Sequence, residues 1–98
     1  MSSERFFCES TGSSPSQAFK RAVNKAFYDH GHNGYTGTIA EKEEEGYIIF
    51  KLPKGRDPQD YASELIDQNG SKIRTKYDPA GCIKIDKGKY LFFGHAQS

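Results

Sequence analysis

The residues best suited to chemistry gather in one short stretch of the 98-residue chain, from Tyr28 to Thr38. It holds two of the three histidines, His30 and His32, together with three glycines. Imidazole titrates near neutral pH, so either histidine can act as a general acid or base, with Tyr35 or Thr38 supplying a hydroxyl. A small His-dependent hydrolase or transferase is therefore one hypothesis, although no nucleophile elbow or triad spacing accompanies these residues.

A metal site is a second hypothesis for the same stretch. His30 and His32 have a spacing that can present two imidazoles to zinc, with Asp29 or His95 as further ligands. A closed zinc site usually has four ligands, and no pair of cysteines lies nearby. We therefore predict no metal and no cofactor.

Residues 34–38 combine two glycines with three hydroxyl-bearing side chains. In phosphate-binding loops the glycines precede a helix, whereas these follow a predicted helix and lead into a predicted strand. Their backbone amides can still form a nest for a small anion, and loops on a rigid scaffold often carry ligands. A helix cap and a tight turn would explain the same residues structurally. The predicted ligand-binding residues are His30, His32, Asn33, Tyr35, Thr36 and Thr38.

The segment HGHNGYTGTIAEK, residues 30–42, resembles a stretch that recurs in small uncharacterised accessory proteins of bacteriophages and bacteria. The resemblance covers the first predicted helix and the hairpin predicted after it. It implies a phage-type accessory protein that acts on a host protein in the host cytoplasm. It implies no catalytic residue.

A second candidate surface lies late in the sequence. Lys72, Arg74 and Lys76 would share one face of a strand, and Lys84 would extend that face. With Tyr90 or Phe92 nearby to stack on bases, this basic face would suit nucleic acid, although no RNA-recognition motif is present. A solvated polar sheet face is the structural alternative.

The elements that must position these residues begin with a helix over residues 15–30. Ser14 is the expected N-cap, Pro15 takes the first helical position, and Gln17 completes a capping box. The apolar stripe places Phe19, Val23 and Phe27 in the core. Gly31 is expected to end the helix.

The rest of the chain is predicted to form strands and a second helix. Residues 35–40 and 47–52 are predicted to form a hairpin. Asp57-Pro58 is predicted to start a short helix that ends at Asn69-Gly70. Residues 72–77, 82–85 and 90–93 are predicted to form a three-stranded meander, with turns at 78–81 and 87–88. Residues 6–8 are predicted to be an edge strand.

Composition sets the class of protein. The length fits one domain over residues 1–98, and the order of elements fits an α+β fold with two helices packed on one face of a mainly antiparallel sheet. With 14 basic and 13 acidic side chains there is no general basic field, and no apolar run is long enough to cross a membrane. Cys8 and Cys82 are expected to be free, buried strand thiols. We expect a cytoplasmic, non-enzymatic binding module for a host protein or a small anionic ligand, of open oligomeric state.

Overall fold

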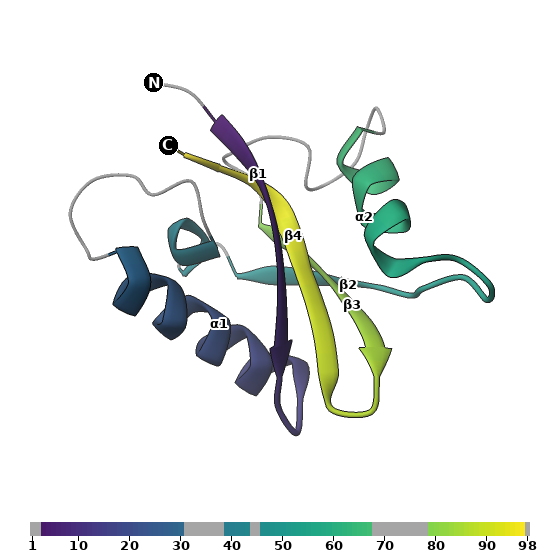
Figure 1. Ribbon diagram of the computed structural model, residues 1–98, viewed down its shortest axis with the longest axis horizontal. Coiled ribbons are helices and arrows are strands. Elements are labelled where there is room, and N and C mark those ends of the chain that lie inside the picture. The colour runs from purple at the N-terminus through teal and green to yellow at the C-terminus, as the bar shows by residue number, and fades with distance from the viewer. Residues whose placement is uncertain (1–2, 31–38, 44–45, 68–78, 98) are drawn as a thin grey trace.

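Four strands and two α-helices make up the part of the chain that the computed structural model describes, residues 3–30, 39–43, 46–67 and 79–97 (Figure 1). The α+β class predicted from the sequence is confirmed. The elements in chain order are β1 (Ser3–Thr11), α1 (Pro15–His30), the 3-10 helix η1 (Ile39–Lys42), β2 (Tyr47–Phe50), α2 (Pro58–Asp67), β3 (Ala80–Asp86) and β4 (Lys89–Gln97).

The strands form one mixed sheet in the order β1-β4-β3-β2. β4 pairs antiparallel with β1 over its whole length, from Ser3 opposite Gln97 to Thr11 opposite Lys89. It also pairs antiparallel with β3, through the predicted turn at Lys87-Gly88, where Gly88 has a φ of 69°. β2 pairs parallel with β3. The predicted strand at residues 6–8 is confirmed, and β1 lies at an edge of this sheet.

The predicted hairpin between residues 35–40 and 47–52 is wrong, because β2 hydrogen-bonds to β3 in parallel and residues 39–42 form η1. Residues 35–38 lie outside the described residues. A 3-10 helix brings side chains three positions apart onto one side. It thereby buries both Ile39 and Lys42, which a strand would place on opposite faces. Lys42 has an interaction partner within the fold, and no buried side-chain nitrogen or oxygen of the described residues lacks a hydrogen-bond partner.

The predicted meander is confirmed only for its last two strands, which are β3 and β4. The turn predicted at residues 78–81 is wrong in part, because Ala80 and Gly81 already belong to β3. Their backbone groups pair in the sheet, and Ala80 N–H donates to the Gly46 carbonyl at 3.0 Å. The third predicted strand, residues 72–77, lies outside the described residues.

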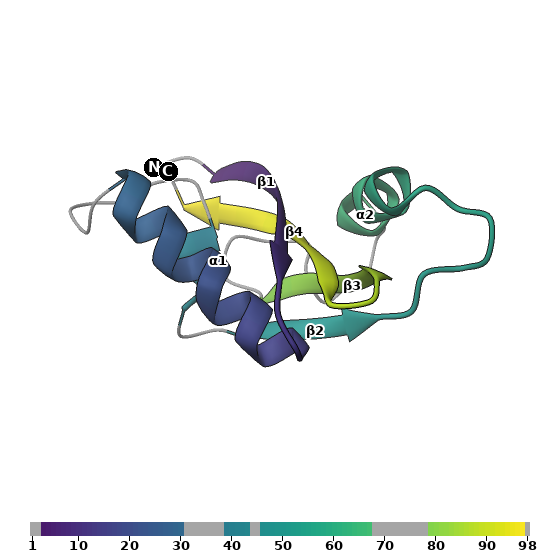
Figure 2. The ribbon, with the colours of Figure 1, turned by 60° about the horizontal axis from the view of Figure 1, so that its bottom comes forward.

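The two helices pack on opposite faces of the sheet, not on one face as predicted (Figure 2). The connection from β1 to β2 crosses the sheet in one direction, and the connection from β2 to β3 returns in the other. Crossover connections between parallel strands share one handedness, so opposite directions of travel place their helices on opposite faces. The described residues therefore form two hydrophobic clusters, one under each helix.

Both helices begin at the predicted caps. Ser14 Oγ accepts a hydrogen bond from Gln17 N–H at 3.2 Å, and Asp57 Oδ2 accepts from the backbone of Gln59 and Asp60, each at 3.1 Å. The Gln17 side chain reaches back to the Ser13 backbone at 2.7 Å, one residue earlier than a capping box requires. Each helix start is therefore fixed by local sequence.

The buried face of α1 consists of small side chains. Ala18, Ala22, Val23 and Ala26 are buried beneath it, together with strand residues such as Phe92. Phe19, predicted to be buried, is only partly so, and its ring packs at the edge against Tyr47 and Phe92 with centroids 5.0 and 5.5 Å away. Phe27 is likewise partly buried. The alanines let the helix approach the sheet closely, which moves the large rings to its flanks.

The face covered by α2 has its own core. Ala62, Leu65 and Ile66 pack against Ile83, Leu91 and Phe93. Gly81 makes this packing possible, because the Phe93 ring occupies the space where a Cβ would stand.

The Gly81→Ala variant is expected to lower the free energy of unfolding by about 1–3 kcal/mol, since the added methyl group must displace the Phe93 ring in a filled core. Urea denaturation measures the loss. In a Phe93→Leu background the same substitution should cost less. An equal loss of unfolding free energy in the wild-type and Phe93→Leu backgrounds would contradict the contact between residue 81 and the Phe93 ring.

Cys82 provides a pH test of the core under α1. Burial raises the pKa of its thiol from 9.0 to about 12. Above pH 9 the unfolded chain releases this proton while the folded protein retains it, so this contribution to stability is present below pH 9 and is lost as the pH rises towards 12. Relative to Cys82→Ala, the wild-type protein should lose roughly 1.4 kcal/mol per pH unit in this window. Parallel pH profiles of the two proteins would contradict the burial.

Candidate functional site

Most of the residues selected from the sequence lie outside the described part of the chain. His32, Asn33, Tyr35, Thr36 and Thr38 follow α1, and Lys72, Arg74 and Lys76 precede β3. His30 is the last residue of α1.

Lys84 is the described member of the predicted basic face. It is exposed on β3, opposite Tyr90 in the β3–β4 register and on the other side of the strand from Ile83 and Ile85, as predicted. Tyr90 and Phe92 are 5% and 0% exposed. The stacking role considered for these two rings requires accessible faces, which they do not have.

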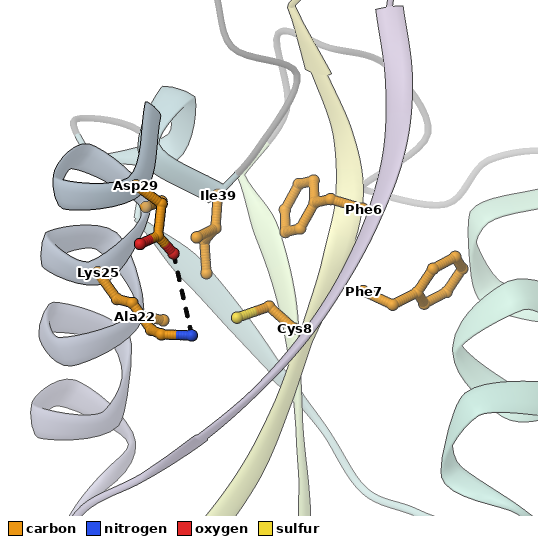
Figure 3. A pocket seen from close by; sticks show the side chains of 8 residues that line it. Phe6, Phe7, Cys8, Ala22, Lys25, Asp29 and Ile39 are labelled. Carbon is orange, nitrogen blue, oxygen red and sulfur yellow. Dashed lines mark ion pairs between the residues drawn. The ribbon is translucent and has the colours of Figure 1, made fainter. Parts of the chain in front are cut away.

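The described residues form a different candidate site, a groove between β1 and α1 that opens beside the edge of the sheet (Figure 3). We call it the edge groove. Its volume is about 180 Å³. Its apolar walls come from three elements, with Phe6 on β1, Ala22 and Ala26 on α1, and Ile39 on η1.

Cys8 projects from β1 into the edge groove, whereas Phe7 points to the opposite face of the sheet (Figure 3). Strand alternation causes this difference. The Cys8 thiol is half-buried, and that burial raises its pKa, an effect that the nearby charge of Lys25 reduces and that of Glu9 increases. A neutral thiol is a weak nucleophile, so Cys8 lines the groove as a small apolar group.

Two opposite charges stand at the mouth of the edge groove. Lys25 and Asp29, one helical turn apart on α1, form an ion pair with Nζ and Oδ2 3.9 Å apart. Both side chains are substantially exposed, so the pair adds little stability. The mouth is therefore polar but balanced in charge, while the walls are apolar.

The outward backbone of β1 is the second part of the site. Among the described strands only β4 pairs with β1, which leaves the other side of a nine-residue strand as a sheet edge. An edge strand presents N–H and C=O groups that another extended chain can pair with. Where an apolar groove opens beside such an edge, an added strand can place alternate side chains into it.

The sequence contained part of the signal for this site. Ala18, Ala22 and Ala26 recur every four residues, which indicates a helix face made for close approach. The sequence could not show that this face would lie beside the sheet edge. That depends on β4, the last strand, inserting between β1 and β3.

No family model, curated protein or solved structure matches the chain. Within the described residues, no helix is both long and apolar enough to span a membrane. That part of the chain also contains no cluster of three or more His, Cys, Asp or Glu side chains able to hold a metal ion.

The accessibility of the edge groove can be measured through its cysteine. Cys8 is expected to react with iodoacetamide in the folded protein while the buried Cys82 does not. The Lys25→Gln variant should slow the reaction of Cys8 at about pH 8, because removing the positive charge leaves its pKa higher and its thiolate rarer. Mass spectrometry of timed samples gives both rates.

The matched control is Lys20→Gln, an exposed lysine on the same helix that does not line the edge groove. It should leave the rate at Cys8 unchanged. Equal slowing by both variants, or faster labelling of Cys82 than of Cys8, would contradict the geometry of the groove.

Proposed function

We propose that the protein is a non-enzymatic binding module that takes up an extended segment of a partner protein as an additional strand beside β1. The observation that carries the proposal is the combination of an edge strand nine residues long with an apolar groove that opens on that edge. Backbone pairing would supply affinity, and the edge groove would select one side chain of the partner.

The dimensions of the edge groove support one large apolar side chain as its occupant. A cavity of about 150 Å³ lined by aliphatic and aromatic groups accommodates benzene. The edge groove, at about 180 Å³, has comparable room for an aromatic or branched aliphatic side chain. Successive side chains of the added strand would alternate between the edge groove and the face that bears Phe7.

The class of partner follows from the resemblance of residues 30–42 to phage and bacterial accessory proteins, which favours a host protein. We place the interaction in the cytoplasm. Cys8 and Cys82 are both free thiols, which is usual in a reducing compartment. The small anionic ligand considered from the sequence would belong to residues 31–38, outside the described part of the chain.

Peptide-display selection against the folded protein tests this function. Binding peptides are expected to be extended, with one large apolar residue that the Ala26→Leu variant no longer accepts, because leucine fills the edge groove. A loss of affinity of about tenfold or more is expected, in line with one buried apolar side chain. Fluorescence anisotropy with the selected peptide measures it.

Lys54→Ala, at an exposed position remote from the edge groove, is the control and should bind as the wild type does. Alkylating Cys8 in the folded wild-type protein blocks the edge groove without a change of sequence, so it serves as a second test if Ala26→Leu unfolds. Amide chemical-shift changes should be concentrated on β1 and α1. Chemical-shift changes confined to β2 and α2, together with peptide affinity unaffected by Ala26→Leu and by alkylation of Cys8, would refute the proposal.

A further inference from the structure

The exposed charges of β1 specify which strand would pair with it best. Arg5, Phe7 and Glu9 alternate along β1, so they lie on one face, the face covered by α2. In antiparallel pairing, directly opposite side chains interact, and opposite charges are favoured over like charges. The best partner therefore places an acidic residue opposite Arg5, an apolar one opposite Phe7 and a basic one opposite Glu9.

Because the pairing is antiparallel, the partner residue opposite Glu9 comes first in the partner's sequence and the one opposite Arg5 comes last. At every second position the partner strand therefore has a basic, then an apolar, then an acidic residue. β1 itself carries this order, in Arg5, Phe7 and Glu9. We propose that a second copy of this chain pairs with β1 in antiparallel orientation, about a two-fold axis at Phe7, so that Arg5 of each copy faces Glu9 of the other. The inference rests on the proposed function only in treating β1 as a strand acceptor.

The ion pairs already present on this face strengthen the register. Arg5 pairs with Asp67 at the end of α2, and Lys89 Nζ lies 3.1 Å from Glu9 Oε1. In the dimer each Arg5 would stand between Asp67 of its own chain and Glu9 of the other, while that Glu9 keeps its own Lys89. Charges of alternating sign would then continue across the interface. Such networks contribute more than isolated surface pairs.

The other face of β1 is compatible with the same register. About an axis at Phe7, Phe6 of one copy lies opposite Cys8 of the other, and both are apolar. The contact is isologous, so it closes after two copies. The two sheets would join into one continuous sheet, and each copy would cover the β1 edge of the other.

β2, the other edge strand of the described sheet, offers a weaker case. It has four residues, Tyr47–Phe50, none of them charged, although Ile49 is 60% exposed. A short strand without charge pattern specifies its register poorly. Charge complementarity along the longer strand therefore favours β1.

A dimer through β1 would regulate the proposed binding site, because the second copy occupies the edge that a partner strand needs. A partner would bind only to the separated chains, and its apparent affinity would fall in proportion to their fraction. Dilution would therefore increase the apparent affinity for a selected peptide.

Sedimentation velocity of the full chain, from about 10 µM to about 1 mM, tests the dimer. Wild type should dimerise in this range. Arg5→Glu and Glu9→Arg should each be monomeric, because each brings like charges together across the axis. An equimolar mixture of the two variants should form a heterodimer, since both acidic side chains of one chain then face both basic side chains of the other. Asp67→Asn, the control, removes only the partner of Arg5 within its own chain and should still dimerise.

A monomeric wild type at all concentrations, or dimers of both charge variants, would overturn the inference.

If a charge variant does not fold by circular dichroism, Phe7→Cys in a Cys8→Ala background replaces it. Directly opposite residues lie within disulfide range, so this variant should form a linked dimer under mild oxidation, and Thr11→Cys in the same background should not. Monomeric Phe7→Cys protein would likewise overturn the inference. A wild-type protein that is monomeric but binds a selected peptide would contradict the dimer and support the proposed function. A wild-type protein that dimerises but binds no peptide when diluted to the monomer would support the dimer and contradict the proposed function.

Discussion

The pairing of β4 with both β1 and β3 is the constraint on which the rest of the described structure depends. β4 is the last strand in sequence but lies inside the sheet, and its alternating side chains supply both cores. Phe92 packs under α1 and Phe93 under α2, and both are fully buried. Without this strand neither helix would have a complete surface to cover, because β1 and β3 would not be joined.

The position of β4 also creates the candidate site. By separating β1 from β3 it leaves β1 as an edge, and the short connection through Gly12 brings α1 back beside that edge. Gly12 donates its N–H to the Gly88 carbonyl at 3.0 Å, and a Cβ at this position would meet the Ala18 backbone at 2.7 Å. Glycine at position 12 therefore allows the start of α1 to pack closely against the end of β1. The edge groove is the space left between the small side chains of α1 and the edge strand.

The edge groove and the charge pattern of β1 use the two faces of one strand. Phe6 and Cys8 face α1, whereas Arg5, Phe7 and Glu9 lie on the face of α2. An added strand would meet both faces at once, because its own side chains alternate in the same way. Selection by a pocket on one face and by charge on the other is therefore available to any chain that pairs with β1.

The sequence by itself determined what depends on near neighbours. The caps at Ser14 and Asp57, the start of α1 and the turn at Lys87-Gly88 rest on contacts within a few residues, and the structure contains them as predicted. Only the tertiary structure decided the order of the strands, the parallel pairing of β2 and the opposite placement of the helices. The candidate site belongs to this second group, since residues of β1, α1 and η1 meet only because β4 pairs between strands that are distant in sequence.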